Sequence, residues 1–279
     1  MPTTQDVIDA IKKSLPDDQA LWSVLGFINP RKQILAFGDD SKIIGRLFEV
    51  VVEPYLQQVA NELGFELGLS EQQTVYPDFW FIKPDHRLIA VDIKSTYRRF
   101  SKNKYASPIG FTLGGYASFL RNGTKNIYST YDNYDAHLVI GFVYTRNSEA
   151  TVGISDIADI SKIKAAYTDV SIFVQEKYKI AGQSKGSGNT NNIGTIKASS
   201  IEPFVEGRSY FSVFGNAVFE DYWRNYPKYT DSKETKEALY TDLLGYFDWL
   251  DRTGKNDQSK TLRDQYKKWL ADPKNESIV

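Results

Sequence analysis

The fold is decided by two segments of β-forming residues, Tyr76-Pro77-Asp78-Phe79-Trp80-Phe81-Ile82 and Leu88-Ile89-Ala90-Val91-Asp92-Ile93-Lys94. The five residues between them, 83–87, include a proline and polar side chains typical of a turn, so the pair is predicted to form a β-hairpin. Side chains alternate along a strand, so Asp92 and Lys94 lie on one face. A hairpin also brings Asp78 beside Asp92. Two adjacent carboxylates repel each other unless a divalent cation lies between them, and a lysine beside them stabilises developing negative charge.

The composition indicates one large α/β unit with peripheral helices. The chain has 279 residues, of which 41% are hydrophobic and 14% aromatic, enough for a substantial core. No apolar run approaches the roughly 20 residues needed to span a bilayer. The amino terminus lacks the regions of a signal peptide, and the absence of cysteine excludes disulfides and thiolate metal sites. An intracellular location is expected.

Charge and histidine content exclude other classes. The 34 basic and 35 acidic side chains give a net charge of −1, so no global field attracts nucleic acid, and DNA binding must use local patches. The only histidines are His86, in the predicted turn, and His137, at the head of an apolar strand. A histidine-rich metal site or a histidine-based acyl-transfer triad is therefore not supported. We expect His137 to be a hydrogen-bonded strand residue.

Apolar periodicity predicts the elements around the hairpin. The first long helix contains Glu49 beside its apolar stripe, and we expect Ser41 to cap its start and Gly64 to end it. Residues 112–115 read as a glycine turn. The predicted helices cover residues 5–15, 41–64, 116–121, 217–226 and 234–250, followed by a short helix near Leu262, Tyr266 and Leu270, and the predicted further strands cover 137–144 and 170–180.

A polar, glycine- and asparagine-rich segment at 182–194 differs from the rest of the chain. Its composition favours a disordered surface loop. The alternative is a recognition loop, because glycine lets the backbone approach a ligand closely and an Asn side chain matches the donor and acceptor pair of adenine in the major groove.

Asp78, followed by Asp92-Ile93-Lys94 on the adjoining strand and preceded by a helix with Glu49, is the pattern of the PD-(D/E)xK nucleases. The pattern alone is weak, but its context is specific. Several longer blocks occur in a fixed order with it: Gln72-Gln73, Phe111-Thr112-Leu113-Gly114-Gly115-Tyr116, Thr124-Lys125-Asn126-Ile127, Val143-Tyr144-Thr145-Arg146, Gly186-Ser187-Gly188-Asn189-Thr190, Phe204-Val205-Glu206-Gly207 and Asp221-Tyr222-Trp223-Arg224-Asn225. Together they resemble the EcoRV-type family of type II restriction endonucleases.

The resemblance covers residues 1–255, as one endonuclease domain with dimerisation and DNA-binding/catalytic subregions, and leaves 256–279 as a C-terminal helical extension. It implies a restriction-endonuclease-like α/β core with a central mixed sheet flanked by helices. It further implies a bacterial, cytoplasmic homodimer that hydrolyses both strands of duplex DNA with Mg²⁺, at GATATC, leaving blunt ends and 5′-phosphates. A cognate DNA methyltransferase is expected in the host.

The resemblance also assigns residues. Asp78, Asp92 and Glu49 match the metal-binding and catalytic carboxylates, and Lys94 matches the catalytic lysine. The residues matched to DNA contacts are Gly186, Ser187, Gly188, Asn189, Thr190 and Asn192 in the recognition loop, Gln72, Gln73 and Thr74 in a minor-groove and backbone loop, and Ser41, Thr112, Ser118 and Lys125 near the DNA backbone or site centre. The chain departs from the family at Ser41, Thr74, Ala117, Gly123 and Asn191. Because of the changes at Thr74 and Asn191, the resemblance does not determine flanking preference or stringency.

Three other functions fit part of the sequence. A repair or recombination nuclease would share the core but needs no discrete recognition loop. A catalytically weak DNA-binding protein would lack a carboxylate or the lysine, whereas Asp78, Asp92 and Lys94 are all present. A hydrolase such as a glycosidase could use the two carboxylates, but it gives Lys94 and the polar loop no role.

Overall fold

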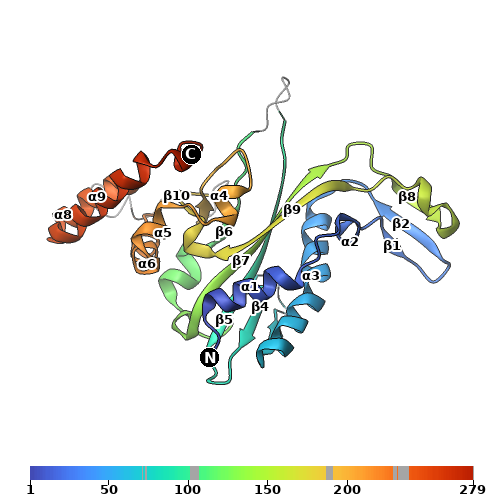
Figure 1. The fold of residues 1–279 in the computed structure, drawn as a ribbon, viewed down its shortest axis with the longest axis horizontal. Coiled ribbons are helices and arrows are strands. Elements are labelled where there is room, and N and C mark those ends of the chain that lie inside the picture. Colours follow the sequence, from blue (N-terminus) through green and yellow to red (C-terminus); the bar gives the residue numbers. More distant parts are fainter. Residues whose placement is uncertain are drawn as a thin grey trace.

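A mixed five-stranded sheet runs through the middle of the molecule in the computed structural model, which describes residues 1–70, 72, 74–100, 107–186, 191–228, 231 and 239–278 (Figure 1). The strand order is β3-β4-β5-β7-β9; β5 and β7 are parallel and the other pairs antiparallel. The strands span Glu66–Leu69 (β3), Phe79–Ile82 (β4), Leu88–Tyr97 (β5), Tyr134–Arg146 (β7) and Tyr167–Glu176 (β9). The predicted α/β class with a central mixed sheet is confirmed.

The predicted hairpin is also confirmed. Strand β4 pairs with β5 from Phe79↔Val91 to Ile82↔Leu88. Continuing that register by one residue places Asp78, just before β4, beside Asp92. Strand β5 is buried along its first six residues, so the two carboxylates belong to a rigid part of the sheet.

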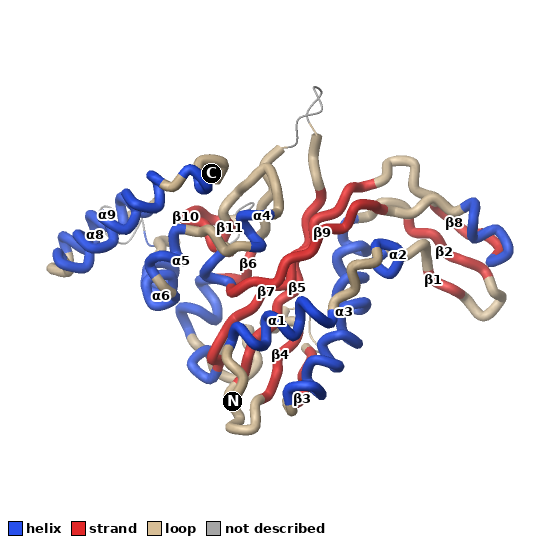
Figure 2. The backbone as a smooth tube through the Cα atoms, in the orientation of Figure 1, coloured by secondary structure: helices blue, strands red, loops and turns tan. Residues whose placement is uncertain are grey.

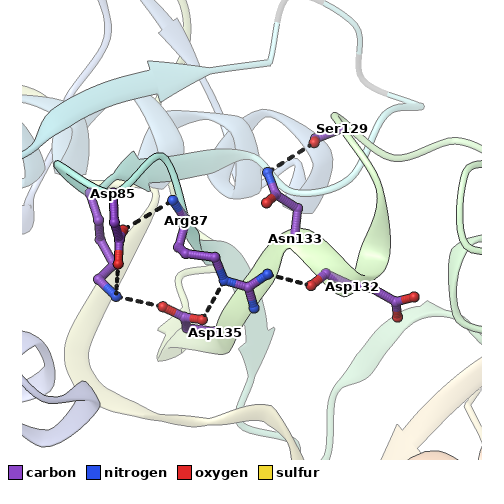
Figure 3. Close-up of polar contacts among 7 residues, drawn as sticks. Asp85, Arg87, Ser129, Asp132, Asn133 and Asp135 are labelled. Carbon is purple, nitrogen blue, oxygen red and sulfur yellow. Dashed lines mark hydrogen bonds and ion pairs between the residues drawn. The ribbon is translucent and has the colours of Figure 1, made fainter.

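Ion pairs fix the turn of this hairpin against the start of β7 (Figure 3). Asp135 accepts from Lys83 Nζ at 2.6 Å and from Arg87 Nε at 2.7 Å. Arg87 also donates to the main-chain oxygen of Asp132 at 2.7 Å. These contacts lie at the end of the hairpin opposite the carboxylates and hold its turn to the start of β7.

Helices cover one face of the central sheet, and further strands and helices cover the other (Figure 2), where an aromatic cluster is buried. On the first face, α1 and α3 pack Val7, Ile11, Phe48 and Val52 against β5, β7 and β9. The second face is built from β6, β10, β11 and the helices of the carboxy-terminal third. The α-helices span Thr4–Ser14 (α1), Gln19–Trp22 (α2), Ser41–Leu63 (α3), Glu202–Val205 (α4), Tyr210–Phe214 (α5), Asn216–Asn225 (α6), Leu243–Arg252 (α8) and Asn256–Ala271 (α9).

Two smaller sheets extend from this core. One has the order β10-β11-β6, with bounds Ala181–Lys185, Asn192–Thr195 and Thr112–Gly115. The other has the order β1-β2-β8, with bounds Phe27–Ile28, Gln33–Phe37 and Val152–Asp156. The second sheet lies at the end of the molecule away from α8 and α9 (Figure 1). The apolar periodicity had not indicated it.

Several predicted boundaries were wrong. The N-cap of α3 is Asp40, whose carboxylate accepts from the N–H groups of Lys42 and Ile43, rather than Ser41. Residues 112–115 form strand β6 instead of a turn, because β11 supplies backbone partners for them. Besides the α-helices, the structure has short helical turns at Tyr116–Leu120 (η1), Tyr131–Asn133 (η2), Ile157–Lys162 (η3), Lys177–Lys179 (η4) and Pro273–Asn275 (η5).

The helix expected over 234–250 begins only at Leu243, where Asp242 caps it by accepting from the Gly245 N–H. Residues 232–238 lie outside the described residues. The predicted end at Gly64 is correct, since that glycine has the left-handed conformation of a helix terminator.

The C-terminal extension is packed onto the rest of the protein. Leu262 and Trp269 of α9 are buried in the aromatic cluster. Trp269 Nε1 donates to Arg208 O at 3.0 Å, and the Ser259 hydroxyl donates to Phe247 O at 3.0 Å. Within the described part of the chain, no helix has the length and hydrophobicity of a membrane span.

Candidate active site

Asp78 and Asp92 meet where the hairpin register brings their strands together. Asp78 Oδ2 accepts the Ile93 main-chain N–H at 2.7 Å. Asp92, on the same strand as Ile93, is 3% exposed. The hydrogen bond from the Ile93 N–H ties the Asp78 carboxylate to β5. Asp92 belongs to the buried part of the same strand, so β5 positions both acidic groups.

Lys94 lies on the same face as Asp92 and pairs with it. Its Nζ is 2.8 Å from Asp92 Oδ2 and donates to Ile93 O at 3.2 Å. Burial opposes the charge, but attraction by Asp92 and then Asp78 outweighs burial and raises the pKa of Lys94. Lys94 is therefore an ammonium at neutral pH, able to donate and to stabilise negative charge. In that form it cannot accept a proton.

Asp78 titrates near neutrality. Burial, followed by repulsion from Asp92, raises the pKa of Asp78 from 3.8 to about 7, against the opposing effects of Lys94 and the Ile93 N–H. Such a rise is expected when two carboxylates share a partly buried site. A positive ligand between the two groups would relieve this repulsion.

The chemistry of this pair fits a hard divalent cation. Asp92 Oδ2 is buried and receives no well-aligned hydrogen bond from any described residue, although Lys94 Nζ is close to it. A buried carboxylate oxygen in this situation, next to a second carboxylate, is a ligand suited to Mg²⁺, which takes few protein carboxylates and completes its shell with water or phosphate oxygens.

Glu49 is engaged elsewhere. It forms an ion pair with Arg46, one turn earlier on α3. Within the described ranges no three His, Cys, Asp or Glu side chains are grouped to hold an ion. Glu49 does raise the pKa of Asp78 electrostatically, so it lies near the site without joining the carboxylate pair.

One groove connects Lys94 with the base of the polar loop. Its volume is about 930 Å³, and Lys94, Thr112 and Gly186 all line it. Its walls also carry cationic and amide side chains that the motif search missed, namely Arg99, Gln183, Lys185 and Lys197. No sequence periodicity could have identified these residues, because they come from separate segments that only the three-dimensional fold brings together.

The ends of the polar loop are pinned by backbone contacts. The Gly186 N–H donates to Asn192 O at 2.9 Å, and Asn192 pairs with Gly115 of β6. A Cβ on Gly186 would lie 2.8 Å from Thr112 Cγ2, so only glycine fits there without displacement. Ser187, Gly188, Asn189 and Thr190 lie outside the described residues.

The remaining predicted DNA-contacting residues lie on the segments around the groove and the carboxylates. Ser118 donates from its hydroxyl to Gly115 O at 3.1 Å, close to the base of the loop. Lys125 is exposed in a turn whose next residue, Asn126, accepts the Tyr76 N–H. Three further predicted residues are exposed: Ser41 at the start of α3, and Gln72 and Thr74 just before Asp78. Gln73 is outside the described residues.

His137 has the expected structural role. It is within hydrogen-bond distance of the Tyr76 hydroxyl, 2.8 Å from its Nδ1, and it stacks on Tyr131. Burial, together with the charge of Lys177, holds the pKa of His137 well below its usual range. A neutral histidine tied to a tyrosine supports packing near the carboxylates.

Known proteins similar to this chain are restriction endonucleases. The family model described as "Restriction endonuclease EcoRV" matches residues 18–251. The type II restriction enzyme EcoRV of Escherichia coli is 38% identical over 256 residues, covering 90% of this chain and 99% of that protein. Among solved structures, the NlaIV restriction endonuclease aligns over 91% of this chain and 96% of its own, at 10% identity and a TM-score of 0.36. The chain therefore belongs to the EcoRV family of type II restriction endonucleases, which are site-specific deoxyribonucleases.

Proposed function

We propose that this protein cuts both strands of duplex DNA at GATATC in a Mg²⁺-dependent reaction, leaving blunt ends with 5′-phosphates. The observation that carries the proposal is the shared groove: Lys94 and Gly186 line one continuous cavity. A groove that joins a hydrolytic lysine to a glycine-rich loop lets one bound duplex contact both.

The proposed chemistry assigns a task to each residue of the carboxylate site. Asp78 and Asp92 would hold Mg²⁺, which supplies charge neutralisation and support for the leaving oxygen. Lys94 is positioned by Asp92 and donates toward the negative charge that develops on the phosphate. For Glu49 we propose a supporting role as a further site carboxylate, because it influences Asp78 while paired with Arg46.

We assign sequence reading to the polar loop. Asn189 can contact an adenine edge bidentately, and Gly186 and Gly188 let the backbone enter the major groove. Further contacts with the DNA backbone or the minor groove would come from Thr112, Ser118, Lys125, Gln72, Gln73, Thr74 and Ser41. Bending at the flexible central TA step would add selectivity at base pairs that the protein does not touch, and it would bring the scissile phosphates to the carboxylates.

A palindromic site and two cuts call for two copies of the chain, and we propose that they meet through the β1-β2-β8 sheet. Phe27, Leu35 and Ile154 are register partners across its three strands and are 50%, 38% and 64% exposed. Val152 adds to the same apolar surface at 77% exposure. A contiguous exposed row of this kind is typical of an interface, and a second copy would cover it symmetrically.

The cellular setting follows from this activity. We place the enzyme in the bacterial cytoplasm, where its DNA substrate is found. A DNA methyltransferase of the same specificity would protect the host sites.

The decisive experiment incubates the purified protein with plasmid DNA of known sequence, with Mg²⁺ or with chelator, and maps the ends by run-off sequencing. We expect Mg²⁺-dependent, blunt cuts at the centre of each GATATC. Cuts at another discrete sequence would overturn the assigned specificity, and random degradation would favour a nonspecific nuclease of the repair type.

A further inference from the structure

Lys177 is a buried lysine that does not belong to the Asp78, Asp92 and Lys94 motif. It lies between the end of β9 and the start of β10, the strand that leads to the polar loop. It is the first residue of η4, and it is 2% exposed. No described Asp or Glu lies within ion-pair distance of its Nζ. A buried ammonium with no close counter-ion is unfavourable, so its environment needs an explanation.

The aromatic rings around Lys177 only partly stabilise it. Its Nζ is 4.6 Å from the centroid of Tyr76 and 4.7 Å from that of Phe119, and these two rings stack on each other at 4.3 Å. Cation–π contacts with buried rings stabilise an ammonium, but by less than the removal of that ammonium from water costs. These contacts therefore offset only part of the cost of burial.

Packing places Lys177 on the face of the central sheet that carries Asp92. Ala90, two residues before Asp92 on β5, shares its face and belongs to the same buried cluster as Tyr76 and Phe119, whose rings lie against the Lys177 Nζ. Tyr76 is also two residues before Asp78 in the chain. The ammonium therefore lies on the buried side of the sheet face that carries Asp92.

The surrounding charges agree with that placement. Burial lowers the pKa of Lys177 to about 8, while Asp92 and Glu220 act to raise it and Lys94 acts to lower it further. Lys177 is thus mostly protonated at neutral pH and interacts electrostatically with both charged groups of the catalytic strand. His137, whose pKa it depresses, is the other titratable neighbour.

We propose that Lys177 is a positioning residue of the hydrolytic site, a standing positive charge on the buried side of Asp92 that weakens the affinity of the carboxylate pair for a divalent cation. Lys94 supplies the charge directed at the substrate, and Lys177 supplies charge on the buried side. Tight cation binding then requires the negative phosphate of bound DNA. This inference rests on the proposed metal-dependent hydrolysis and adds a determinant of when the cation binds.

The test measures the Mn²⁺ affinity of the DNA-free protein at about pH 7.5, from the electron paramagnetic resonance of free Mn²⁺. Lys177→Met keeps the length of the side chain and removes its charge. We expect it to bind Mn²⁺ about threefold or more tightly than the wild type. Its melting temperature should equal or exceed that of the wild type, because an uncompensated buried charge is removed.

Two control variants separate the possible failures. Lys179→Met removes a lysine two positions on, which pairs with Glu176, and should leave Mn²⁺ affinity unchanged. Asp92→Ala should lose the site. If Asp92→Ala binds Mn²⁺ as the wild type does, the metal assignment fails and the inference fails with it. If Asp92→Ala weakens binding but Lys177→Met matches or falls below the wild type, only the inference fails. Should Lys177→Met not fold, Lys177→Gln is read by the same criteria.

Discussion

The proposed hydrolytic region and the proposed reading region of this enzyme are built by different physical means. Asp78, Asp92 and Lys94 are positioned by strand register within a sheet that is buried on both faces. The polar loop is positioned by closure of its ends, where Gly186 bonds to Asn192 and Asn192 pairs with Gly115. Register fixes a few side chains rigidly. Closure fixes the two ends of the loop, at Gly186 and Asn192.

This difference teaches where each property can be changed. Substitutions in the hairpin should alter the chemical step with little effect on which sequence is chosen. Substitutions in the loop should alter choice while the metal site stays intact. Four substitutions test this separation between the chemical step and the choice of sequence, beginning with the largest expected effect.

Removing a hydrolytic carboxylate should abolish cutting. For Asp92→Ala we expect cleavage to fall by about 10⁴-fold, because the charge holding both the cation and Lys94 is lost. Binding to a GATATC duplex in a gel-shift assay should remain within about tenfold of the wild type. Retained cleavage would show that the site is wrongly assigned.

Removing the Asn189 side chain should affect which DNA sequence is cut. For Asn189→Ala we expect cleavage at GATATC to drop by about 10²-fold, since each lost bidentate base contact contributes roughly 1–3 kcal/mol and the palindrome contains two. Mn²⁺ affinity should not change. The matched control is Asn191→Ala in the same loop, because the Asn191 side chain accepts from the Tyr116 hydroxyl at 3.2 Å. An unchanged site preference in Asn189→Ala would mean that another residue reads the sequence.

Cleavage of both DNA strands should require the association of two chains, each with its own hydrolytic and reading region. Ile154→Glu introduces charge into the exposed apolar row on β8. We expect light scattering to report a monomer and double-strand cleavage to fall by about tenfold or more. The control Leu244→Glu alters a leucine with similar exposure, 56%, on α8, and should remain dimeric. A dimeric Ile154→Glu would exclude this sheet as the interface.

The smallest expected effect is on the free energy of unfolding, which repulsion between Asp78 and Asp92 lowers. Because the pKa of Asp78 is raised to about 7 in the folded protein, keeping it ionised destabilises the native state above that pH, and the penalty disappears as pH falls toward 4. Asp78→Asn, measured by urea unfolding with chelator, should be more stable than the wild type at pH 8 by roughly 1–3 kcal/mol and equal to it below about pH 4. A wild type at least as stable at pH 8 would contradict the proposed repulsion.

The sequence by itself determined the hairpin, the carboxylate–lysine face and the family. Strand alternation and a turn with Pro84 are local properties, so Asp92 and Lys94 could be assigned to one face before any contact was known. The blocks from Gln72 to Asn225 carried the family resemblance from which the reading loop is proposed, because their order and spacing are written in the chain.

Tertiary structure decided what depends on contacts between distant segments. Residues 112–115 became a strand because β11 offers hydrogen-bond partners, and α3 begins after Asp40 because that carboxylate reaches its first free N–H groups. The β1-β2-β8 sheet combines segments more than 100 residues apart, so no local pattern predicted its exposed face. Lys177 is ordinary in sequence, and only the packing of Tyr76 and Phe119 against the residues after β9 buries its charge. Local propensity specifies which side chains share a face, whereas burial and charge proximity depend on the whole fold.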